Sequence, residues 1–297
     1  MRGIIRTRTE AEMMDLILAF ARGDERIRGT LLNGSRANPD SEGDIFSDYD
    51  IANLVTDVEP FRDYQRIESH FGPFMLVQTP EDNEWPAPIG DGRYNYNMQL
   101  ADGNRIDLSF FHISRAEEVT GDSLTLVLLD KDGMLPEVPP PGESSYFVME
   151  PTPKLYTDCC TEFFFGLGSH VPKTLWRRDL PLLHRYMDVV LRRPLVMMLG
   201  WEAGFECDFR ISVGKAGGRL KEHLSGDDWE MFMRTYPDSN FENIWESLKV
   251  FYTMFMGSGE RVAGHCGYDF PREDGERAWA FLQHVHNLPG DAERIFQ

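Results

Sequence analysis

Two short stretches near the start of the chain decide the fold: Leu31-Leu32-Asn33-Gly34-Ser35-Arg36 and Asp48-Tyr49-Asp50-Ile51. The first is an apolar strand that ends in a Gly-Ser turn, and the second places an Asp-x-Asp pair at the start of another apolar strand. Because strand side chains alternate between two faces, Asp48 and Asp50 point one way while Tyr49 points the other way. Adjacent carboxylates repel each other unless a cation lies between them, so the pattern predicts a metal site.

The turn between these strands suits a phosphate group. Gly34 and Ser35 offer backbone N–H groups, a hydroxyl and no bulky side chain. Mg²⁺ prefers oxygen ligands and is usually shared with substrate phosphates. The alternative is that the Asp-x-Asp pair is a solvated turn or a helix cap and that Gly-Ser is an ordinary turn. The two motifs together, each joined to an apolar strand, favour the site of a nucleotidyltransferase.

A third carboxylate completes the pattern. Residues 104–111 alternate apolar and polar side chains, so Asp107 and Ser109 share the face that points away from the core. The preceding strand, Tyr94 to Leu100, is joined to this stretch by a turn that contains Asp-Gly, a strong hairpin signal. We therefore predict that Asp107 lies on a hairpin strand beside the Asp-x-Asp strand. The alternative is a surface aspartate on a half-exposed strand.

With these motifs the chain resembles the nucleotidyltransferase superfamily that includes DNA polymerase β, and most closely the aminoglycoside 6-adenylyltransferases, also called streptomycin adenylyltransferases. The resemblance covers nearly the whole chain and rests on these stretches: Asn33-Gly34-Ser35-Arg36, Asp44–Asp50, Pro80-Glu81-Asp82, Ile106-Asp107-Leu108, Asp158–Phe163, Val213-Gly214-Lys215, Thr235-Tyr236 and Asn243–Glu246. It implies transfer of AMP from ATP to a hydroxyl of an aminoglycoside, the 6-hydroxyl of streptomycin above all, with release of pyrophosphate and inactivation of the drug.

The resemblance also implies roles for individual residues. Asp48, Asp50 and Asp107 would hold Mg²⁺, two ions in all, and Asp107 could be a base, a metal ligand or both. The nucleotide would be bound by residues of the Gly-Ser turn and by two lysines: Gly34, Ser35, Arg36, Lys173 and Lys215. Each lysine could equally be a plain surface charge.

Three acidic residues are candidates for binding the cationic drug. Asp82 and Glu84 belong to an acidic, proline-rich loop that is either a substrate rim or an ordinary solvated loop. Glu162 precedes three phenylalanines, and we expect it to lie buried among them. There it would hold a substrate amine or guanidinium, or cap a buried network.

Composition narrows the partners. The net charge of −19 disfavours binding to nucleic acid and fits a cationic ligand. Many proteins, however, carry a negative net charge simply because it keeps them soluble. The four cysteines show no C-x₂-C pair, so we expect reduced thiols and no zinc. We see no signal peptide and no apolar run of the roughly 20 residues that a membrane span needs, and we expect a cytoplasmic protein. The oligomeric state stays open, with a monomer favoured.

The predicted class is α+β, in two domains. Residues 1–150 would form a catalytic domain with a polymerase β-like mixed sheet, and residues 151–297 a helical bundle, with a substrate cleft between them. Prolines concentrate in the linker at 134–151. The predicted elements include a helix opened by a capping box at Thr9, a helix over 61–70, strands at 27–33 and 74–78, and helices over 153–166, 181–204 with a kink at Pro194, 227–236, 241–257 and 272–288.

Two other functions compete with the drug-modifying one. The first is a nucleotidyltransferase of the same fold that acts on a different aminoglycoside or on a protein hydroxyl. The second is a nucleotide-binding protein without catalysis. The presence of Asp48, Asp50 and Asp107 together disfavours the second alternative, because a protein that has lost catalysis has no need of all three carboxylates.

Overall fold

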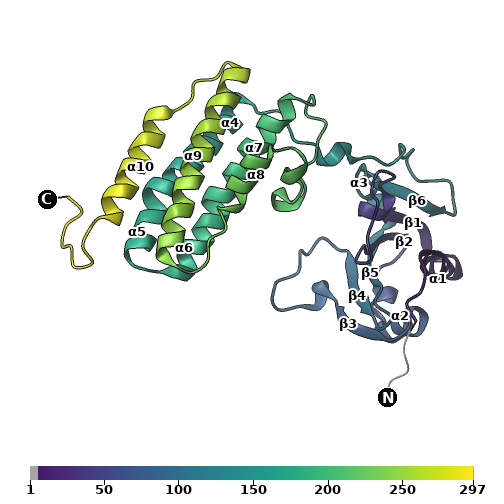
Figure 1. Cartoon of the computed structure of the whole chain (residues 1–297). Coiled ribbons are helices and arrows are strands. Elements are labelled where there is room, and N and C mark those ends of the chain that lie inside the picture. The colour runs from purple at the N-terminus through teal and green to yellow at the C-terminus, as the bar shows by residue number, and fades with distance from the viewer. Residues whose placement is uncertain (1–5, 297) are drawn as a thin grey trace. The chain divides into compact units, whose positions relative to one another are not determined.

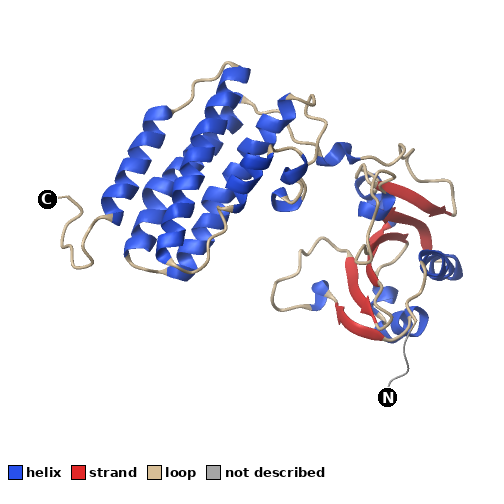
Figure 2. Cartoon of the chain, in the orientation of Figure 1, coloured by secondary structure: helices blue, strands red, loops and turns tan. Residues whose placement is uncertain are grey.

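The computed structural model describes residues 6–296, which divide into two compact units between Ser145 and Tyr146 (Figure 1). The first unit combines a β-sheet with helices, and the second unit is built from helices and loops (Figure 2). The predicted α+β class, with a mixed sheet followed by a helical bundle, is confirmed. Across the described residues, the structure contains no helix with the length and apolar character needed to cross a membrane.

Within residues 6–296 the first unit carries one sheet of six strands in the order β3-β4-β5-β2-β1-β6. The strands are β1 Ile27–Asn33, β2 Tyr49–Val55, β3 Phe74–Gln78, β4 Tyr94–Leu100, β5 Arg105–His112 and β6 Thr125–Asp130. Only β2 and β5 run parallel to each other among the paired strands, and the other neighbours are antiparallel. The predicted hairpin joins β4 to β5.

Burial follows the predicted alternation along β5 and at the start of β2, whereas the rest of β2 is buried on both faces. Tyr49 and Ile51 are buried on one face of β2, and Ile106 and Leu108 are buried on β5. The residues between them, Asp50 and Asp107 among them, are only partly exposed. Since a shift of one residue would exchange the two faces, burial of the apolar side chains fixes the register of the whole β2–β5 pair.

The α-helices among the described residues of the first unit are α1 Glu10–Gly23, α2 Tyr64–Phe71 and α3 Ala116–Val119. The capping box at the start of α1 is confirmed, because Thr9 and Glu12 each bond the other's backbone. The predicted apolar face of α1, with Met13 and Ile17 at its centre, is buried. Helix α2 begins at Tyr64, later than predicted, because the side chain of Asp63 caps it there.

The second unit contains the helices α4 Pro153–Phe165, α5 Val171–Trp176, α6 Leu180–Tyr186, α7 Arg193–Phe205, α8 Gly226–Met233, α9 Phe241–Cys266 and α10 Arg272–His286. Thr152 caps α4 and Pro153 occupies its first turn, as predicted. Helix α9 continues past its predicted end at residue 257 to Cys266. The rings of Phe163 in α4 and Phe255 in α9 stack with centroids 3.8 Å apart in the core.

The helix predicted over 181–204 is confirmed, since residues 180–205 are helical without a break, and the distortion expected at Pro194 is a π-helical turn just before that proline. A π-helical turn, Met187–Arg192, separates α6 from α7, and a second π-helical turn, Gly166–His170, separates α4 from α5. Each π-turn is followed two residues later by a proline, Pro194 or Pro172. Proline has no N–H and its ring crowds the preceding turn, so a widened turn relieves the clash. The two π-turns pack closely, because a Cβ on Gly166 would lie 2.9 Å from Val190.

Asp102 ties the start of the chain to the β4–β5 turn. Its carboxylate accepts hydrogen bonds from Arg8 Nε at 2.6 Å and from the backbone N–H of Asn104 at 3.1 Å. Burial alone would raise the pKa of Asp102, but the hydrogen bonds from Arg8 and Asn104 outweigh it and lower the pKa from 3.8 to about 2.

We predict that Asp102→Asn lowers the free energy of unfolding at pH 7 by about 1–3 kcal/mol, because hydrogen bonds to a charged, buried acceptor are lost. The pKa is lower in the folded state, so this stabilisation is complete above pH 4 and disappears as the pH falls toward 2. Urea unfolding of both proteins between pH 7 and pH 2 measures it. The same substitution at exposed Asp132 is the control, and an equal loss at both positions would contradict the assignment.

Candidate metal and phosphate site

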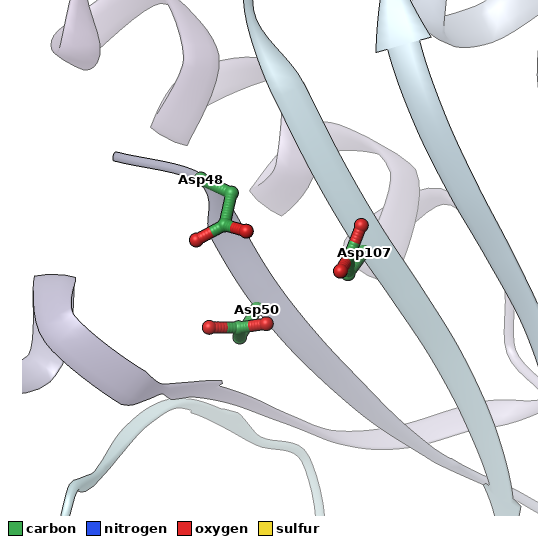
Figure 3. Close-up of side chains that lie close together, drawn as sticks. All are labelled: Asp48, Asp50 and Asp107. Carbon is green, nitrogen blue, oxygen red and sulfur yellow. The ribbon is translucent and has the colours of Figure 1, made fainter. Parts of the chain in front are cut away.

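Three aspartates come together at one edge of the β2–β5 pair. Asp48 directly precedes β2, Asp50 is its second residue, and Asp107 lies opposite Asp50 in the parallel register. One carboxylate oxygen from each side chain lies within 4.8 Å of the other two. Figure 3 shows the three carboxylates facing a shared space between the strands. The structure thus brings together the residues that the sequence singled out.

The donor set fits a divalent cation. All three side chains are partly exposed, with 29% of Asp48 and 24% of Asp107 accessible, so an ion from solvent can reach them. Three carboxylates supply hard oxygen ligands and three negative charges, which suit Mg²⁺. Within residues 6–296 this is the one group of three histidine, cysteine or acidic side chains that meets the distance expected of a metal site.

Gly34 allows Asp50 to approach the turn. Its backbone has a φ of 73°, and a Cβ atom would lie 2.3 Å from Oδ2 of Asp50. The expectation that the Gly34 N–H is available to a phosphate is wrong, because it donates to the carbonyl of Leu124 at 3.0 Å and so extends the β1–β6 pairing. Gly34 therefore contributes space, while Ser35 is exposed in the 3₁₀ turn Gly34–Ala37.

Arg36 holds the segment that carries Asp48. Its guanidinium donates to the carbonyl oxygens of Ser47 at 2.8 Å and Asp48 at 3.0 Å, and it lies over the ring of Tyr49 at 4.0 Å. Glu10 pairs with the remaining side of the guanidinium. These contacts favour a role in positioning Asp48 over the direct nucleotide contact that the sequence suggested.

Arg105 is a member of the site that the sequence reasoning missed. It donates to both carboxylate oxygens of Asp107, at 2.7 and 3.0 Å, and its Nε lies 3.6 Å from Asp48. The hydrogen bond to Asp107 raises the pKa of Arg105, and the charges of Asp48 and Asp50 add to the shift. The signal was available, because residues two apart on a strand share a face.

The acidic loop places its carboxylates differently. Asp82 accepts a hydrogen bond from Tyr94 Oη at 2.5 Å and pairs with Arg62 at 3.0 Å, so two of its neighbours already satisfy it. Glu84 is exposed. Glu81, which was not a candidate, bonds the backbone of Asn95 at 2.9 Å and fastens the loop to β4.

The expected burial of Glu162 is wrong. Glu162 is exposed, while the following residues Phe163 and Phe164 are buried. Successive residues of a helix point in directions about 100° apart, so neighbours in sequence need not share a face. A carboxylate at this position is therefore open to solvent within the second unit.

The two predicted lysines lie on different elements of the second unit, and both are exposed. Lys173 in α5 lines a pocket of about 460 Å³ together with Trp176 and Arg177. Lys215 begins a short 3₁₀ turn, and the next residue, Ala216, lines a different pocket of about 720 Å³. Arg192 and Tyr236 line that larger pocket with their side chains stacked at 3.7 Å.

Comparison with known proteins shows the family of the chain. The family profile described as Streptomycin adenylyltransferase matches residues 7–285. The chain belongs to the streptomycin adenylyltransferase family. An aminoglycoside 6-adenylyltransferase of Bacillus subtilis (strain 168) is 35% identical over 270 residues, which are 90% of this chain and 94% of that protein. A protein of the same name from Staphylococcus aureus is 30% identical over 89% of this chain and 94% of its own length.

A solved structure of an aminoglycoside 6-adenyltransferase from Bacillus subtilis is 30% identical, covers 95% of this chain and all of its own, and superposes with a TM-score of 0.47. Because the chain belongs to the streptomycin adenylyltransferase family, it is a nucleotidyltransferase enzyme. This family is connected with aminoglycosides and with resistance to them.

We predict that Gly34→Ala lowers the free energy of unfolding by at least about 2 kcal/mol, because a left-handed backbone disfavours a side chain by about 1–2 kcal/mol and the Cβ also collides with Asp50. In an Asp50→Ala background the collision disappears, so the loss shrinks by about 1 kcal/mol or more. A double-mutant cycle by chemical denaturation measures this coupling.

Gly23→Ala is the matched control, because a Cβ there meets nothing within 4 Å at the end of α1. It should change stability by less than about 1 kcal/mol, toward the more stable side. Strictly additive effects of Gly34→Ala and Asp50→Ala would show that the two residues do not press on each other.

Proposed function

We propose that this enzyme transfers the adenylyl group of ATP to a hydroxyl of an aminoglycoside, the 6-hydroxyl of streptomycin in particular, and releases pyrophosphate. The single observation that carries the proposal is the cluster of Asp48, Asp50 and Asp107 in a member of the streptomycin adenylyltransferase family. Relatives that bear the name aminoglycoside 6-adenylyltransferase support the drug class and the hydroxyl. Adenylylation of that hydroxyl would inactivate the drug.

The three carboxylates would hold Mg²⁺, two ions in all. Asp48, Asp50 and Asp107 would supply the carboxylate ligands of these ions. Bound ions would supply charge stabilisation at the attacking and leaving oxygens of the displacement. The fit rests on the geometry of the oxygens, which lie within 4.8 Å of one another on two adjacent strands.

The proposed reaction is a displacement at the α-phosphorus of ATP, assisted by side chains of the site. The acceptor oxygen attacks the α-phosphorus of ATP, the bond from that phosphorus to the oxygen of the β-phosphate breaks, and pyrophosphate leaves with the electron pair. The proton of the acceptor hydroxyl passes to Asp107 or to water. Gly34 lets the carboxylate of Asp50 lie close to the turn, and the exposed hydroxyl of Ser35 donates to a phosphate oxygen.

Charge supports a cationic acceptor. The chain carries a net charge of −19, which attracts a drug with guanidinium or ammonium groups and repels nucleic acid. Glu84 and Glu162 are exposed carboxylates that would contact such groups, and Asp82 would do so through the face that Arg62 and Tyr94 leave open. One of the two lysines, Lys173 or Lys215, would contact the triphosphate, because they lie at different pockets. We expect the reaction to take place in the cytoplasm, where ATP is available.

A mass assay identifies the acceptor. The purified protein is incubated with ATP, Mg²⁺ and a panel of aminoglycosides that includes streptomycin, and the drugs are analysed by mass spectrometry. We expect streptomycin to gain one adenylyl group and pyrophosphate to appear in equal amount. Modification of a different aminoglycoside alone would retain the reaction and reassign the acceptor. Failure to modify any aminoglycoside would contradict the proposed substrate class.

We predict that Asp50→Asn lowers the rate of adenylyl transfer by at least about 10²-fold, because the loss of one ligand charge removes several kcal/mol of transition-state stabilisation. The thermal unfolding midpoint should not fall, since one of three mutually repelling carboxylates is removed. Asp57→Asn is the control, because Asp57 follows the same strand, is exposed and lies outside the cluster. An active Asp50→Asn enzyme would refute the assignment of the carboxylates.

A further inference from the structure

Arg105 is the cation that the fold itself supplies to the three aspartates. It is the first residue of β5, and its guanidinium forms a two-point contact with Asp107 through Nη2 at 2.7 Å and Nε at 3.0 Å. The same Nε lies 3.6 Å from Oδ2 of Asp48. One positive charge thus spans the two strands that carry the carboxylates.

We propose that Arg105 is the internal counter-ion of the cluster and competes with the divalent cation for Asp107, a role that rests on the metal site proposed above. Arg105 is a positioning residue in this scheme. It keeps the carboxylates of Asp48 and Asp107 close together before a metal ion binds, and it withdraws from Asp107 when the ion binds.

The chemistry of arginine supports competition by movement. A guanidinium keeps its proton at any physiological pH, so the charge of Arg105 can leave the site only if the side chain turns away. The side chain is 48% exposed and stands at the end of a strand, so solvent can receive it. Asp107, by contrast, is held in place by the backbone pairing of β5 with β2, in which it lies opposite Asp50.

Two opposite effects follow when the charge of Arg105 is removed. Without a metal ion, three carboxylates within 4.8 Å lose their counter-charge and repel one another, so the metal-free protein becomes less stable. When a metal ion binds to the wild type, the two-point contact between Arg105 and Asp107 must first break, and a neutral residue 105 removes this cost. A hydrogen-bonded pair of charged groups at a partly exposed site corresponds to roughly a tenfold change in affinity.

The test uses the full-length protein and Mn²⁺ alone, which is paramagnetic and reports its own free concentration by electron paramagnetic resonance. Four variants are compared with the wild type: Arg105→Gln, Arg105→Met, Arg105→Lys and Asp50→Asn. Arg105→Met removes the charge but retains an apolar side chain of similar length, so an effect shared by both neutral variants does not come from lost packing. Arg28→Gln is the matched control, because Arg28 forms a two-point pair with Asp132 at the opposite end of β1 from the cluster.

We expect Arg105→Gln and Arg105→Met to bind Mn²⁺ about tenfold more tightly than the wild type. We expect both to melt at a lower temperature in EDTA and to gain more thermal stability from the ion. Arg105→Lys, which keeps the charge, should bind close to the wild-type value, and Arg28→Gln should leave the Mn²⁺ affinity unchanged.

The two assignments fail in different ways. If the neutral Arg105 variants bind Mn²⁺ no more tightly than the wild type while Asp50→Asn loses binding, the metal site stands and the counter-ion role of Arg105 is wrong. If Asp50→Asn binds Mn²⁺ as the wild type does, the metal site of the proposed function is wrong. If the neutral Arg105 variants melt at a lower temperature but do not bind Mn²⁺ more tightly, Arg105 only forms a structural ion pair and does not compete with the metal.

Discussion

Mutual repulsion among three carboxylates is the constraint on which the first unit depends. Asp48, Asp50 and Asp107 bring three negative charges within 4.8 Å of one another, and such an arrangement persists only if the surroundings hold it. The backbone pairing of β2 with β5 fixes two of the residues, and Arg36 fixes the segment of the third through the carbonyls of Ser47 and Asp48. Arg105 supplies part of the missing positive charge.

The parallel pair of strands, β2 and β5, positions Asp50 and Asp107 side by side. In β2 and β5 the apolar side chains of Tyr49, Ile51 and Leu108 are buried on one face, which leaves the carboxylates on the other. The chain between these strands forms α2, β3 and β4 before it returns, and that length of chain is what a parallel pairing requires. Because Gly34 has no side chain, the turn at the end of β1 can lie directly against the carboxylate of Asp50.

The second unit is organised by packing rather than by charge. Its aromatic core, with Phe163 stacked on Phe255, and its two π-helical turns bring helices near enough that Gly166 has no room for a Cβ. This packing turns Glu162 outward, and it surrounds the buried Arg192 with Tyr236 and the carbonyl of Thr235. The two pockets described in this unit are lined mainly by apolar side chains with a few cationic ones among them, whereas the site of the first unit is acidic.

Local patterns in the sequence predicted most of the elements, though not all of their bounds, and singled out the three aspartates. Alternation placed Asp107 opposite its core neighbours, Asp-Gly marked the hairpin, and Thr9 and Thr152 marked helix starts, because each signal acts within a few residues. Partners distant in sequence were decided by the tertiary structure alone: the carbonyl of Leu124 that takes the Gly34 N–H, the approach of Val190 to Gly166, the outward turn of Glu162, and the contact of Arg105 with Asp48. A sequence pattern predicts which face of a strand or helix a residue occupies, because that depends on near neighbours. Which distant residues contact that face depends on how the whole chain folds.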